Sequence, residues 1–135
     1  MTLQRCSKSD SIYAMYFAQI KLDGLPKLIN ATSFNNWRVV YGERKKWKEK
    51  VARCFVVDAP KNPLKKAQIT CIRYSSRQSD YDGLVSSFKA CIDGLKLAKV
   101  IEDDNPNVIG MPIFLWKKAP PKLGFIEIIV KEILE

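Results

Sequence analysis

The alternation of apolar and polar residues along the chain predicts four β-strands. β-Branched and aromatic residues are concentrated in residues 12–22, and apolar and polar side chains alternate along residues 66–74. Two more apolar segments, residues 108–117 and 123–134, are separated by the sequence Pro-Pro-Lys at 120–122. Because the segment between them is short and rich in proline, we expect these two strands to pair as a hairpin.

Apolar residues at helical spacing predict two helices, over residues 42–57 and 82–100. Residues 24–37 contain a proline and three asparagines and are expected to form an irregular loop. The resulting order is β-α-β-α-β-β, which favours an α+β fold with two helices packed on one mixed β-sheet. All 135 residues are expected to form one domain, in which residues 1–11 are a flexible N-terminal segment.

The composition is typical of a globular domain, with 47% hydrophobic and 27% charged residues. No apolar run approaches the ~18 residues of a membrane span. The polar N-terminus also lacks the apolar core of a secretory signal. We therefore expect a cytoplasmic protein that has no membrane partner.

The absence of histidine limits the chemistry available to this chain. It excludes Ser-His and Cys-His nucleophile pairs, histidine bases and histidine-zinc sites. The four cysteines contain no Cys-x-x-Cys pair, so a zinc site is not expected, and Cys71 and Cys91 lie in apolar patterns typical of buried thiols. Hydrolytic chemistry would depend on carboxylates, lysine, tyrosine or a metal, and carboxylates favour magnesium or manganese.

Positive charge is unevenly distributed along a chain whose net charge is +9. Residues 21–77 contain fourteen Lys and Arg residues against four Asp and Glu. A surface with this bias attracts polyanions such as nucleic acid, although a solvated, solubilising surface would have the same composition.

Six of the fourteen acidic residues lie between Asp80 and Asp104, against the general charge of the chain. A helical wheel over residues 82–100 gives an apolar stripe of Leu84, Phe88, Cys91, Ile92 and Leu95. The opposite, polar face carries Asp82, Ser86, Lys89 and Asp93. If the turns at both ends of this helix fold back along one sheet edge, the carboxylates converge and attract a cation.

Each of these acidic residues also has a purely structural interpretation. Asp82 stands where a helix N-cap is expected, and Lys89 with Asp93 forms an i, i+4 pair. Asp103 and Asp104, followed by Asn-Pro, are typical of a plain turn.

The same segment resembles the RusA-like Holliday junction resolvases. The sequences at residues 80–84 (Asp-Tyr-Asp-Gly-Leu), 88–95 (Phe-Lys-Ala-Cys-Ile-Asp-Gly-Leu) and 100–104 (Val-Ile-Glu-Asp-Asp) are similar to that family's Asp-x-Asp-Asn-Leu, Lys-Ala-x-x-Asp-x-Leu and Gly-Val-x-x-Asp-Asp motifs. Upstream, Leu-Pro-Lys at 25–27 and Lys-Lys-Trp at 45–47 resemble the phage-type branch. The resemblance extends from about residue 12 to residue 134.

The resemblance implies a magnesium-dependent endonuclease that acts as a homodimer on four-way DNA junctions, with no organic cofactor. It implies that Asp80, Asp82 and Asp104 bind the metal, for which manganese could substitute, and that Lys89 is essential for cleavage. Asp93 and Asp103 would support these residues. The DNA-binding side chains are expected to be Arg38, Lys45, Lys46 and Arg77.

Two other classes of function remain open at the level of sequence. Gly83 stands where the family has asparagine, which is compatible with a catalytically inactive branched-DNA-binding protein of prophage origin. A structural or protein-interaction module with a solvated basic face is the third class.

Overall fold

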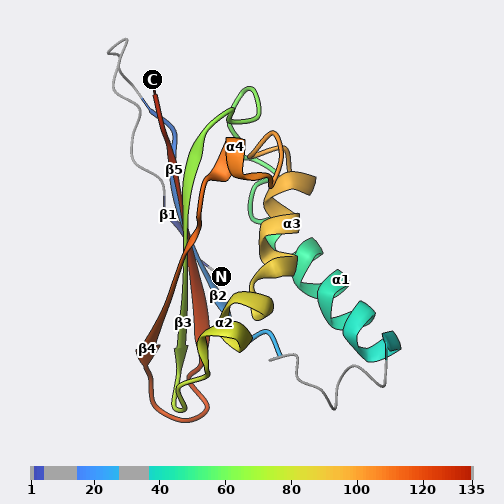
Figure 1. The fold of residues 1–135 in the computed structure, drawn as a ribbon, viewed down its shortest axis with the longest axis vertical. Helices are drawn as coiled ribbons and strands as arrows, with labels where there is room; N and C mark the ends of the chain where they lie inside the picture. The colour runs from blue at the N-terminus through green and yellow to red at the C-terminus, as the bar shows by residue number, and fades with distance from the viewer. Residues whose placement is uncertain (1, 5–14, 28–36, 135) are drawn as a thin grey trace.

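The computed structural model describes residues 2–4, 15–27 and 37–134, and it confirms the expected α+β class (Figure 1). The elements are β1 (Thr2–Gln4), β2 (Phe17–Asp23), α1 (Trp37–Arg53), β3 (Ala67–Ser75), α2 (Tyr81–Ser87), α3 (Lys89–Leu97), α4 (Pro106–Ile109), β4 (Ile113–Lys118) and β5 (Phe125–Glu132). The described helices all lie on one side of the sheet in Figure 1. Within the described ranges, no helix is both long enough and apolar enough to cross a membrane.

The strands form one mixed sheet in the order β1-β2-β5-β3-β4. β5 pairs antiparallel with both β2 and β3, whereas β4 lies at the sheet edge, parallel to β3. The predicted hairpin between the last two strands is therefore wrong. Every second side chain of β5 is fully buried, whereas most of β4 is exposed. The more buried strand lies in the centre of the sheet, between β2 and β3, and the more exposed strand lies at its edge.

Several boundaries differ from those predicted. α1 begins at Trp37, inside the predicted loop, and ends at Arg53; residues 28–36 of that loop lie outside the described residues. The predicted helix over residues 82–100 is divided into α2 and α3 at Phe88. Val108, predicted to begin a strand, instead lies buried in the short helix α4. Asn105 caps this helix, because its side-chain oxygen accepts a hydrogen bond from the backbone N–H of Asn107 (2.9 Å).

At the N-terminus, the pattern of residues 12–22 predicted a strand that the structure places at Phe17–Asp23. Residues 12–14 of that prediction lie outside the described residues. Thr2–Gln4, assigned by sequence to a flexible segment, instead pair antiparallel with β2. The flexible assignment is therefore wrong for these three residues. Their polar sequence has no strand pattern, and the strand is formed by backbone pairing with β2.

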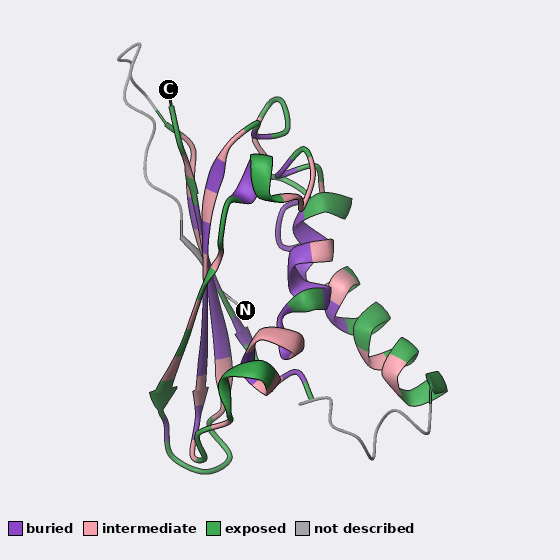
Figure 2. Ribbon diagram, in the orientation of Figure 1, coloured by how far each residue is buried: buried purple, intermediate pink, exposed green. Residues whose placement is uncertain are grey.

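The core lies between the sheet and α3, and α1 packs against the outer side of α3. Figure 2 shows the buried positions gathered on the facing surfaces of these layers. The predicted apolar stripe is confirmed, because each of its members is at most 8% exposed: Leu84, Phe88, Cys91, Ile92 and Leu95. Gly94 lies where α3 meets α1, and a Cβ atom there would be 2.6 Å from the Lys48 carbonyl oxygen. This close approach requires a glycine where α1 packs on α3.

The thiols of Cys71 and Cys91 are fully buried and free, as the sequence predicted. Burial raises the pKa of Cys91 to about 12 and raises that of Cys71 well above its usual value, because desolvation disfavours the thiolate. We expect neither thiol to react with iodoacetamide at pH 8 in the folded protein and both to react in urea, since the thiolate is the nucleophile. Peptide mass spectrometry measures this, and labelling of either cysteine without denaturant would contradict the burial.

Candidate functional site

The acidic segment begins at the N-terminus of α2, directly after the β3 strand and its turn. Asp80 is the N-cap, and its Oδ1 accepts a hydrogen bond from the Gly83 backbone N–H (2.9 Å). Asp82 is the second residue of α2, within its first turn, and is exposed. The N-cap role considered for Asp82 is therefore wrong, because the helix begins one residue earlier than predicted. Both carboxylates therefore lie at the N-terminal end of α2.

Lys89, at the start of α3, lies between two carboxylates that come from different parts of the chain. Its Nζ is 3.8 Å from Asp93 Oδ1 and 3.6 Å from Asp104 Oδ2. Asp93 is on the same helix, whereas Asp104 comes from the turn after α3. The three side chains are 59%, 37% and 28% exposed respectively. Ion pairs at such exposure contribute only about 0–1 kcal/mol to stability.

Asp103 holds the turn that presents Asp104. Asp103 Oδ1 accepts a hydrogen bond from the Asp104 backbone N–H (2.8 Å) and pairs with Lys96 Nζ at 3.0 Å. Its Oδ2 accepts a hydrogen bond from Asn105 Nδ2 (2.9 Å). The hydrogen bond from Lys96, followed by those from Asp104 and Asn105, holds the pKa of Asp103 well below its usual range. The same contact raises the pKa of Lys96. Asp103 thus orders the turn that precedes α4, and its supporting role in a catalytic site stays a prediction.

The two ends of the acidic segment are not joined directly. Across the described ranges, no hydrogen bond or ion pair connects Asp80 or Asp82 with Asp104. The described part of the chain also contains no group of three or more His, Cys, Asp or Glu side chains placed to hold a metal ion. The carboxylate donors have the chemistry that magnesium prefers, and both ends of the segment are open to solvent. The convergence of Asp80, Asp82 and Asp104 stays a prediction.

The predicted DNA-binding side chains lie on α1 and on the turn after β3. Arg38, Lys45 and Lys46 are exposed on α1, and Arg77 is exposed beyond β3. Arg44, Ser86 and Ser87 line one small hollow, so α1 and α2 are in direct proximity. The basic helix therefore borders the acidic segment.

Two exposed aromatic side chains in this region were not among the residues predicted from the sequence. Trp37 and Tyr41 are 68% and 63% exposed and lie one helical turn apart on α1. Trp37 was assigned to the predicted loop over residues 24–37, so its place on the same helix face as Tyr41 was not expected. The spacing of four residues from Trp37 to Tyr41 and from Tyr41 to Lys45 was visible in the sequence.

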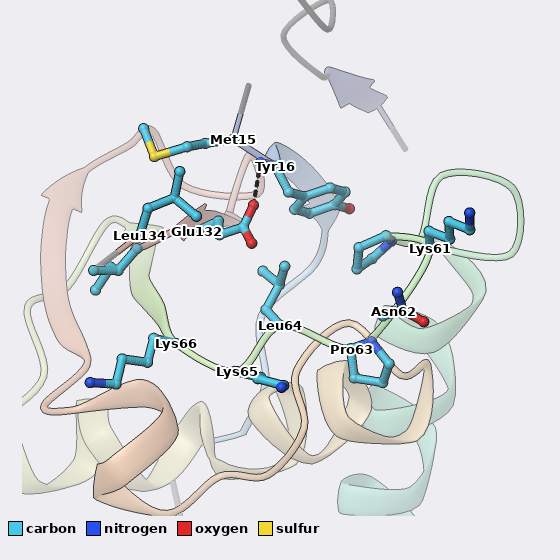
Figure 3. A pocket seen from close by; sticks show the side chains of 12 residues that line it. Met15, Tyr16, Lys61, Asn62, Pro63, Leu64, Lys65, Lys66, Glu132 and Leu134 are labelled. Carbon is cyan, nitrogen blue, oxygen red and sulfur yellow. Dashed lines mark hydrogen bonds between the residues drawn. The ribbon is translucent and has the colours of Figure 1, made fainter. Parts of the chain in front are cut away.

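A well-formed pocket lies elsewhere, between the start of β2, the end of β5 and the loop before β3 (Figure 3). It has a volume of about 610 Å³ and is lined by Tyr16, Leu64 and Glu132 among others. The Tyr16 backbone N–H donates a hydrogen bond to Glu132 Oε1 (2.9 Å), which ties β2 to β5 at its rim. None of the predicted site residues lines this pocket.

Neither the protein-family models nor the curated protein sequences give a match to this chain. The resemblance to the RusA-like resolvases therefore rests on the sequence motifs alone, chiefly those at residues 80–84, 88–95 and 100–104.

Proposed function

We propose that this protein is a magnesium-dependent endonuclease that cuts Holliday junctions or related branched DNA. The observation that carries the proposal is the position of Lys89, which contacts Asp104 from a separate turn as well as Asp93 on its own helix. An exposed lysine beside two carboxylates, bordered by a basic helix, suits the cleavage of a phosphodiester.

The roles of the residues follow from their chemistry. Asp80, Asp82 and Asp104 are the residues proposed to hold Mg²⁺, which would supply Lewis-acid activation of the phosphate and a bound water of lowered pKa. Magnesium usually takes one or two protein carboxylates together with waters and phosphate oxygens, so the three need not be gathered before DNA binds. Lys89 would stabilise negative charge that develops on the phosphate or the leaving oxygen. Asp93 and Asp103 would orient Lys89 and the turn of Asp104.

The basic side chains on α1 and Arg77 are proposed to bind phosphates that flank the cleaved bond. Replacing Lys45 with glutamine is expected to weaken binding to all DNA sequences similarly and to reduce the slope of log affinity against log salt by about 0.9. Fluorescence anisotropy at several salt concentrations measures the slope. Lys61→Gln, which removes an exposed lysine beside the remote pocket, is the matched control. Equal slopes for the two variants would remove Lys45 from the DNA interface.

We also propose that the protein acts as a homodimer, because a four-way junction presents two symmetric strands. Ile113 and Leu115 of the edge strand β4 are 43% and 42% exposed. In the strand register they point to the same face as Ile72, away from the Arg73 and Trp116 pair. Apolar exposure on this edge supports association between copies of the chain.

The proposal is tested with a labelled four-way junction, a fork and a linear duplex of the same length. We expect cleavage of the branched substrates with Mg²⁺ or Mn²⁺, little cleavage of the linear duplex, and none in EDTA. Asp82→Asn should bind the junction without cutting it. Cleavage of all three substrates at one rate would contradict the branch specificity, and equal nicking by Asp82→Asn would remove Asp82 from the chemistry.

A catalytically inactive branched-DNA-binding protein is the second candidate. It is favoured by Gly83, which stands where the resembled family has asparagine, and the described residues contain no group of three His, Cys, Asp or Glu side chains placed to hold a metal ion. Tight binding of the junction with no cleavage under any divalent ion would select this candidate.

A further inference from the structure

An exposed aromatic and basic stripe runs along α1, outside the residues discussed for catalysis. Trp37, Tyr41 and Lys45 follow one another at intervals of four residues, so they lie on one face of the helix. Trp37 is 68% exposed and Tyr41 is 63% exposed. The guanidinium carbon of Arg38 lies 5.5 Å from the centre of the Trp37 ring.

The packing of α1 does not require these two rings. The helix is held by Trp47 and Val51, which are 2% and 0% exposed and come from another face of α1. Trp47 also donates a hydrogen bond from Nε1 to Glu43 Oε1 (3.0 Å). By contrast, Trp37 and Tyr41 leave most of their area in water, where a large apolar surface is unfavourable.

We propose that Trp37 and Tyr41 form a stacking site for unpaired DNA bases, with Arg38 and Lys45 binding the adjoining phosphates. This inference rests on the proposed action on DNA. Aromatic rings stack on any base, and a row of them beside cations is the usual way in which proteins hold single strands. The bases of an intact duplex already stack on one another, so the rings select nucleotides that a branch leaves unpaired.

The position of the stripe connects it with the acidic segment. Arg44, one turn beyond Tyr41, lines the same hollow as Ser86 and Ser87 of α2. A strand held on α1 therefore borders the helix pair that carries Asp82 and Lys89. The inferred substrate class is a branch with unpaired nucleotides next to the cleaved bond, such as a fork, a flap or a gapped junction, in preference to a fully paired junction.

The test compares the parent with Trp37→Ala/Tyr41→Ala on a fork with single-stranded arms and on a duplex of equal length. We expect the double variant to lose about tenfold or more in affinity for the fork and less than about twofold for the duplex, from the usual effect of removing a stacked ring. Trp37→Phe/Tyr41→Phe, which keeps flat rings, should retain affinity for the fork. Val39→Ala, an exposed apolar change on the same helix, is the matched control.

Anisotropy and cleavage measured on the same samples separate this inference from the proposed function. Parental affinity of the double alanine variant for the fork would overturn the stacking site, while cleavage by the parent would leave the nuclease proposal standing. An equal loss of affinity for fork and duplex would also overturn it. Selective loss on the fork, without cleavage by the parent, would support stacking and remove the nuclease. If the parent binds no DNA at low salt, both proposals fail.

Discussion

Replacing Lys89 with alanine is expected to lower the single-turnover rate of junction cleavage by about 100-fold or more. Lys89 Nζ lies 3.8 Å from Asp93 Oδ1 and 3.6 Å from Asp104 Oδ2, and the variant removes the cation that is proposed to stabilise the reacting phosphate. Losing one preorganised group of this kind commonly costs ~10²–10³ in rate. DNA affinity should change much less, because only one phosphate contact is lost. Rapid-quench cleavage with excess enzyme measures the rate.

Lys96→Ala is the matched control for this variant. Lys96 lies on the same helix, is similarly exposed and also pairs with an aspartate, Asp103. Because Lys96 contacts the supporting residue and not Asp104, its loss should leave the cleavage rate within a few-fold of the parent. An equal fall in rate for Lys89→Ala and Lys96→Ala would contradict a specific role of Lys89 in cleavage. It would mean that Lys89 acts only through the general positive charge of the helix.

Replacing Gly94 with alanine is expected to lower the free energy of unfolding by about 1–3 kcal/mol, the usual cost of overfilling a packed contact. The new Cβ atom would lie 2.6 Å from the Lys48 carbonyl oxygen and 2.9 Å from Val51 Cβ, so the backbones of α1 and α3 must separate. This cost exceeds the gain of about 1 kcal/mol that alanine has over glycine within a helix. Urea denaturation of the parent and the variant measures the difference.

Gly42→Ala is the control for that experiment. Gly42 lies within α1, and an added Cβ atom there would meet nothing within 4 Å. The substitution should stabilise the protein by about 0.5–1 kcal/mol through helix propensity alone. A Gly94→Ala variant as stable as Gly42→Ala would contradict the close packing of α1 on α3.

The parts of the fold that depend on short-range patterns were predictable from the sequence. The alternation that predicted a strand over residues 66–74 is confirmed by β3 to within one residue at each end. The apolar stripe from Leu84 to Leu95 is confirmed because burial of one helix face follows directly from a spacing of three and four residues.

Strand pairing was not predictable in the same way. The segments that became β4 and β5 are separated by a short proline-rich turn, which favours a hairpin. Strand order is instead set by long-range packing: β5 lies between β2 and β3, and its side chains Ile126, Ile128 and Val130 are buried in the core. The break between α2 and α3 at Phe88 likewise left no local signal, since Phe88 continues the apolar stripe.

For the candidate site, the sequence identified the residue types but not their pairing. The i, i+4 relation of Lys89 and Asp93 was visible, whereas the contact of Lys89 with Asp104 depends on how the turn after α3 folds back. Asp80 and Asp82 could not be distinguished as N-cap and first-turn residue, because the helix start was uncertain by one position.

The most direct test of the site compares Asp104→Asn with Asp103→Asn in single-turnover cleavage of a bound four-way junction after addition of Mg²⁺. Asp104 faces Lys89, whereas Asp103 is engaged by Lys96 and Asn105. The proposed site predicts that Asp104→Asn binds the junction but cuts it at least about 100-fold more slowly than the parent. The cleavage rate of Asp103→Asn should fall far less than that of Asp104→Asn. Cleavage by Asp104→Asn at the parental rate would contradict a shared site of Asp80, Asp82 and Asp104.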